Sequence, residues 1–144
     1  MTPIDPNQTL VEAQHRSLLI IWVFLFMSVV GFAVMTVLIP SNAHGDDRVL
    51  PIGLVGLSLL NLGLSFVLKR SFLAQSVAKQ DLALVLKAYI VALALCESAG
   101  LFGLLIHFAT GSPYFYFAFA VALVGMGLHF PKKQHLFDAS FKKL

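Results

Sequence analysis

Four long apolar blocks constrain this chain more than any other feature of its sequence. They cover residues 17–39, 50–68, 82–109 and 113–130. A helix needs about 20 apolar residues to cross a hydrocarbon core of about 30 Å, and each block meets or approaches that length. Only 12% of the residues are charged, against about 25% in soluble domains. The chain is therefore predicted to be an all-α integral membrane protein, a single four-helix bundle over residues 1–144.

The basic residues predict which ends of the helices face the cytoplasm. Arg16 precedes the first block, and Arg48 lies between the first and the second. The other eight lie between the second and third blocks, just inside the third, or after the fourth: Lys69, Arg70, Lys79, Lys87, Lys132, Lys133, Lys142 and Lys143. Positively charged loops tend to stay in the cytoplasm. Both termini and the middle loop are therefore predicted to be cytoplasmic, in the inner membrane of a bacterium.

Residues 131–144 are predicted to form a basic cytoplasmic tail at the membrane surface. Four apolar residues of this tail can share one face of a short helix: Leu136, Phe137, Phe141 and Leu144. The lysines that flank this face are Lys132, Lys133, Lys142 and Lys143. Such a helix would lie on the anionic inner leaflet. The alternative is a frayed basic tail that only sets the topology.

Small residues predict how the helices pack, because they let helices approach closely in a bilayer. The third block carries Ala88, Ala92, Cys96 and Gly100 at four-residue spacing. The second block offers Gly53, Gly56 and Gly63 together with a polar stripe of Ser58, Asn61 and Ser65. The fourth block offers Ala118, Ala122 and Gly125. The third helix is therefore predicted at the centre of the bundle, and the bulkier first helix at its periphery.

Glu97 is the carboxylate inside the apolar blocks. A charge at such a depth costs at least about 2.5–3.5 kcal/mol on insertion scales, so an intramembrane carboxylate indicates a functional site. Asn61 is predicted at a similar depth on the neighbouring helix, where its amide can donate to the carboxylate. The sequence thus predicts a site for protons or small cations, formed by Glu97 with Asn61, Ser98, Ser58 and Ser65.

The residues around Glu97 also carry a resemblance to a known family. The run Cys-Glu-Ser-Ala-Gly-Leu-Phe-Gly-Leu at residues 96–104 resembles the ion-binding helix of rotor-ring proteolipids, the c-type subunits of rotary ATP synthases. That family is a helical hairpin with a mid-membrane carboxylate on its second helix, and residues 53–109 are similar in order. The resemblance implies that Glu97 is the ion-carrying carboxylate. The dense glycine run and the Arg-Gln/Asn-Pro loop motif of the family are not found here.

The predicted function is that of a small polytopic subunit of a larger membrane assembly, in which Glu97 binds protons or small cations. Two alternatives stay open: a purely structural subunit, and a small transporter that acts as a homo-oligomer. The sequence shows no catalytic or cofactor-binding motif, so no enzyme activity, cofactor or metal is predicted. The expected partners are the lipid bilayer and other membrane subunits or a second copy. Nucleic acid is not expected, because the basic residues sit at helix ends.

Overall fold

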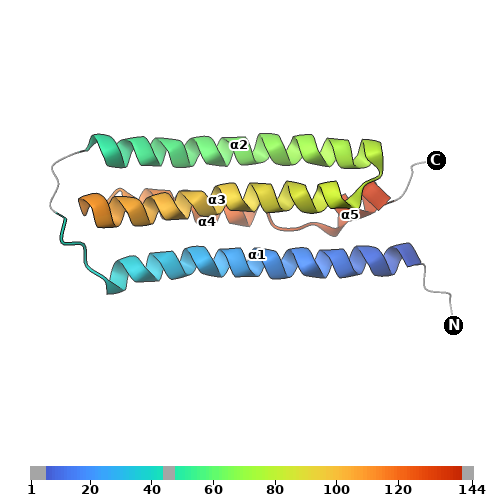
Figure 1. Ribbon diagram of the computed structural model, residues 1–144, viewed down its shortest axis with the longest axis horizontal. Helices are drawn as coiled ribbons and strands as arrows, with labels where there is room; N and C mark the ends of the chain where they lie inside the picture. The colour runs from blue at the N-terminus through green and yellow to red at the C-terminus, as the bar shows by residue number, and fades with distance from the viewer. Residues whose placement is uncertain (1–5, 44–47, 141–144) are drawn as a thin grey trace.

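The computed structural model describes residues 6–43 and 48–140, and every regular element in this part of the chain is a helix. The helices are α1 (Pro6–Leu38), α2 (Val49–Lys79), α3 (Leu82–Thr110), α4 (Phe115–Leu128) and α5 (Lys133–Ser140). Helices α1 to α4 run alternately in opposite directions. In Figure 1, α3 lies between α1 and α2, and α4 lies behind α3. The predicted all-α class is confirmed for the described residues.

Three helices are long and apolar enough to cross a membrane, namely α1, α2 and α3. Helix α4 has 14 residues, which gives it a length of about 21 Å at 1.5 Å per residue. It reaches the length of a span only together with α5, from which it is bent by 48°. The described residues therefore contain three candidate spans, or four if α4 and α5 count as one bent span, where the sequence predicted four continuous spans.

Local chemistry sets the ends of α2 and α3. Gln80 adopts a left-handed backbone with φ of 53°, and the Asp81 side chain accepts a hydrogen bond from the Ala83 N–H at 2.8 Å. A turn of these two residues joins the helices, so α2 and α3 are antiparallel neighbours. At the other end of α3, Gly111 has φ of 64° and lies so close to the Ala43 carbonyl that a side chain would clash with it. Glycine satisfies both requirements.

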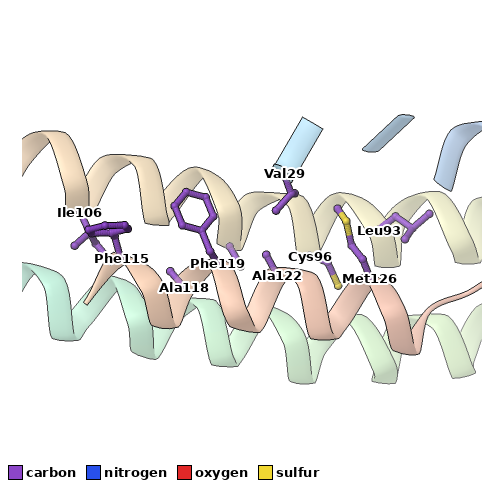
Figure 2. Close-up of a cluster of buried hydrophobic side chains, with 10 residues drawn as sticks. Val29, Leu93, Cys96, Ile106, Phe115, Ala118, Phe119, Ala122 and Met126 are labelled. Carbon is purple, nitrogen blue, oxygen red and sulfur yellow. The ribbon is translucent and has the colours of Figure 1, made fainter. Parts of the chain in front are cut away.

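Helix α3 is the central helix, as its small residues predicted, and it contacts each of the other four. Its buried face includes Ala88, Ala92, Cys96 and Gly100. The side chain of Val29 on α1 lies against Gly100, and the ring of Phe119 on α4 lies against Gly103. Figure 2 shows the apolar cluster that α3 and α4 form with Val29 of α1. In an apolar stretch of 18 residues, 11% of the residues of α1 are buried, against 44% of those of α3. This difference agrees with the predicted peripheral place of α1.

The glycines of α2 do not make the contacts that the sequence indicated. Gly53, Gly56 and Gly63 are exposed, and no neighbouring atom lies within 4 Å of where a side chain would begin. Ser58 and Ser65, on the polar stripe, are buried instead. On this inner side Asn61 bonds to Ser98 of α3 and Ser65 contacts His129, whereas a glycine has no polar side chain to satisfy. Helix α2 therefore turns its polar stripe inward and its glycines outward.

The short helix α5 packs its apolar face onto the protein. Leu136 and Ala139 are fully buried in a cluster with residues of α1 and α3, namely Val11, Leu18, Val85 and Tyr89. Full enclosure between two helices removes more apolar surface from water than a place among lipid headgroups would. The prediction that this face lies on the membrane is therefore wrong for Leu136.

Only part of the predicted membrane-surface set can be located. Lys132 and Lys133 are exposed at the start of α5. Phe141, Lys142, Lys143 and Leu144 lie outside the described residues. The predicted contact of the exposed lysines with anionic lipid stays a prediction.

Gly125 marks a close approach of α4 to α2 and α3. A methyl group at this position would lie 2.7 Å from the Cys96 sulfur and 2.8 Å from a methyl group of Leu62. Gly127, on the same helix, faces open space. We expect Gly125→Ala to have a free energy of unfolding about 1–3 kcal/mol lower than Gly127→Ala, because overpacking strains the interface. Unfolding of both variants in mixed micelles, followed by circular dichroism, measures this difference. Equal stabilities would contradict the close packing.

Candidate functional site at Glu97

Glu97 lies on α3 and accepts its hydrogen bond from α1. The Ser28 hydroxyl donates to Oε1 of Glu97 at 2.7 Å. Asn61, the partner expected from the sequence, donates instead to the Ser98 hydroxyl at 2.7 Å. Consecutive residues of an α-helix differ by about 100° around its axis. Ser98 therefore faces α2 while Glu97 faces α1, and two separate bonds replace the predicted pairing of Asn61 with Glu97.

The other two members of the predicted set do not bond to Glu97. The Ser58 hydroxyl donates to the Leu54 carbonyl of its own helix at 2.9 Å. The Ser65 hydroxyl donates to the Leu62 carbonyl at 2.6 Å. The structure thus brings Asn61 and Ser98 together, and it adds Ser28 to the surroundings of Glu97. Ser28 was recognisable in the sequence as a small polar residue inside a bulky apolar helix, but its partner was not.

Glu97 lies beside an uncovered face of α3. Ala94, three residues before it, and Leu101, four residues after it, are both exposed. Ile90 and Leu105 continue this face and are 41% and 49% exposed. Glu97 itself is partly exposed. Helices α1 and α2 flank α3, and α4 covers its other side (Figure 1). Glu97 is therefore partly accessible from the side of the bundle.

A second cluster of polar side chains, which the sequence did not predict, lies where α4 ends and consists of His129, Ser65 and Lys69. His129 is fully buried, with Nε2 2.7 Å from the Ser65 hydroxyl and Nδ1 3.4 Å from Nζ of Lys69. The geometry fits one tautomer: Lys69 donates to Nδ1, and the Nε2–H donates to the Ser65 oxygen. Ser65 and Lys69 are four residues apart and share a face of α2. That spacing was the available sequence signal.

Tyr89 extends this polar cluster toward α5. The ammonium nitrogen of Lys69 lies 4.2 Å from the centre of the Tyr89 ring. The Tyr89 hydroxyl lies 2.7 Å from Nδ1 of His135 and accepts from the Lys132 N–H at 3.1 Å. These two contacts join α3 to the start of α5.

The side chains that could bind a metal ion do not lie together in the described residues. Within residues 6–43 and 48–140, no group of three or more His, Cys, Asp or Glu side chains could hold a metal ion. Cys96 is a free, buried thiol.

No protein family, curated protein or solved structure matches this chain. The resemblance of residues 53–109 to rotor-ring proteolipids stays a prediction.

The bond from Ser28 to Glu97 predicts an energetic coupling between α1 and α3. We expect a double-mutant cycle of Ser28→Ala with Glu97→Ala to give a coupling energy of about 0.6 kcal/mol, the average for polar pairs in membrane helices. The matched cycle uses Ser58→Ala, because Ser58 bonds only to its own helix; it should give no coupling. Unfolding in mixed micelles measures both cycles. Equal coupling energies would show that the Ser28 contact carries no specific interaction.

Proposed function

We propose that this protein is a small subunit of a larger membrane assembly, in which Glu97 takes up and releases protons or small cations. The position of Glu97 is the observation that carries the proposal. It is a carboxyl group on an apolar helix, and it is partly exposed beside an uncovered face. A charged carboxylate is unfavourable at such a depth unless it is protonated, paired or hydrated. A group that alternates between a bound and a released proton meets this constraint.

The surroundings of Glu97 favour a subunit over a complete transporter. The hydrogen bond to Glu97 comes from the neutral hydroxyl of Ser28, and no second carboxylate or basic side chain bonds to Glu97 within the described residues. A complete transporter needs groups that alternately open and close access to each side of the membrane. Lateral access to the carboxyl suits ion exchange with a neighbouring subunit that supplies these groups.

The α2–α3 hairpin gives the proposal further support. Helices α2 and α3 are antiparallel and joined by a two-residue turn, and the carboxylate lies on the second of them. This arrangement agrees with the resemblance to rotor-ring proteolipids, which are also hairpins with a carboxylate on the second helix. We infer from that resemblance only the role of Glu97 as an ion-binding group.

The proposal includes an orientation in the membrane. We infer that the end of the bundle with the α2–α3 turn and α5 faces the cytoplasm, in the inner membrane of a bacterium. Lys69, Arg70, Lys132 and Lys133 all belong to this end, and positive charge is retained on the cytoplasmic side. In this arrangement α4 and α5 together complete the fourth, bent crossing, with α5 at the membrane surface.

A structural role for Glu97 is the second candidate. The observation in its favour is the bond from Ser28, which joins α1 to α3. A protein in which the carboxyl group only joins these helices would keep its function when an amide takes its place, because an amide oxygen can accept the same bond.

The decisive test compares Glu97→Gln and Glu97→Asp with the wild type. We expect the wild-type protein, purified from native membranes with its partners, to support ion-coupled activity of the assembly. Glu97→Gln should lose this activity, and Glu97→Asp should retain part of it. Cys96→Ala, which changes the adjacent residue, is the matched control and should keep the activity.

Two outcomes would refute the proposal. A wild-type protein that purifies without partners would exclude the subunit role. A Glu97→Gln assembly with full activity would exclude ion binding and leave the structural role.

Labelling of single cysteines in intact cells tests the orientation. In a Cys96→Ala background, Gln75→Cys should react with a membrane-impermeant maleimide only after the cells are permeabilised, because the α2–α3 end is proposed to be cytoplasmic. Gly45→Cys, at a position between α1 and α2 in the sequence, should react without permeabilisation. The reverse pattern would invert the proposed topology.

A further inference from the structure

A groove between α2 and α5 lies next to the polar cluster that includes Lys69 and Tyr89. It has a volume of about 600 Å³, within the range of about 300–1,000 Å³ that is usual for small-molecule sites. Its polar lining consists of Lys69, Arg70, His135 and Asp138. Its apolar lining consists of Phe66, Leu73, Ala74 and Val77. Neither the ion-binding proposal nor the helix packing accounts for this combination.

The charges at the groove are unbalanced. Lys69 contacts the ring of Tyr89 and the neutral nitrogen of His129, and Arg70 is exposed. Neither forms a salt bridge with a carboxylate in the part of the chain that the structure describes. Lys132 lies close enough to act on Lys69 as a second positive charge. Asp138 is the one acidic residue in the lining. The groove therefore has one carboxylate against two cationic side chains, Lys69 and Arg70.

The depth of the groove matches the headgroup level of a bilayer. Helix α2 begins at Val49, and Lys69 lies 20 residues further along, a distance of about 30 Å at 1.5 Å per residue. This distance equals the thickness of a hydrocarbon core. Lys69 and Arg70 therefore reach the boundary between acyl chains and headgroups when Val49 lies at the opposite boundary. Phe66, one turn back toward the middle of the membrane, is 42% exposed and offers apolar surface to an acyl chain.

We propose that this groove binds one anionic phospholipid, with its phosphate between Lys69 and Arg70 and the upper part of an acyl chain against Phe66. Basic pockets between helices at the cytoplasmic surface bind the headgroups of anionic lipids. Leu73, Ala74 and Val77 form the wall of the groove on its solvent side. The bound lipid would join α2 to α5. The inference uses the membrane placement proposed above and is independent of any ion-binding role of Glu97.

Native mass spectrometry of the full-length protein in detergent tests the inference. The probes are dioctanoyl phosphatidylglycerol, dioctanoyl phosphatidylcholine and inorganic phosphate. We expect the phosphatidylglycerol to bind more tightly than the phosphatidylcholine. Arg70→Gln should weaken the binding of phosphatidylglycerol about fivefold, the effect of one cation near an anionic lipid. Lys79→Gln, an exposed change on the same helix outside the groove, is the matched control and should leave binding unchanged.

A gain-of-function variant sharpens the test. Asp138→Asn removes the carboxylate of the groove and should tighten phosphatidylglycerol binding, which no loss of folding could imitate. Equal binding of the two lipids, or an Arg70→Gln protein that binds like the wild type, would overturn the inference. Displacement of the lipid by inorganic phosphate at equal concentration would also overturn it, because the groove would then recognise a free anion. Glu97→Gln should bind lipid like the wild type, so the two proposals fail separately.

Discussion

The close approach of α3 to its neighbours is the constraint on which this fold depends. Inside a bilayer the apolar surface of a helix gains little by leaving lipid, so close van der Waals contact must hold the helices together. Gly125 lets α4 come within reach of Cys96, and Gly100 lets α1 place Val29 directly on α3. The two contacts lie one turn apart on the same buried face of α3, at Cys96 and Gly100. They fix both α1 and α4 around it, and the bonds at Ser28 and Asn61 can form only after the helices have come this close.

The features that follow from local sequence were predictable. Long apolar blocks predicted the order of the first four helices, because the energy of placing each residue in lipid adds up along a helix. The central place of α3 followed from its four-residue row of small side chains. The inward orientation of Ser58, Asn61 and Ser65 was partly predictable, since their spacing puts them on one face of α2. Their partners were not predictable, because partners depend on the neighbouring helices.

The errors have one physical origin, the rotation of each helix about its own axis. Hydropathy fixes how deep a residue lies, and the bond of Asn61 to Ser98 agrees with the expectation that Asn61 lies at a depth similar to that of Glu97. It does not fix direction around the axis, and a step of one residue directs Ser98 rather than Glu97 toward α2. The same uncertainty applies to α5, because an amphipathic face fits a protein surface as well as a membrane. Only the complete arrangement of α1 and α3 provides the enclosed place that Leu136 occupies.

The bonds at Glu97 and Ser98 have a mechanical consequence. They come from neighbouring residues of α3, so α1 and α2 are both attached to α3 at one level of the bundle. A motion that keeps both bonds cannot slide either helix along α3; it can only tilt the helices about this level. When the helices tilt in this way, their ends on one side of the bonds would move apart while their ends on the other side move together. A change at Glu97 that breaks its bond would remove the polar link of α1 at this level and leave that of α2 in place.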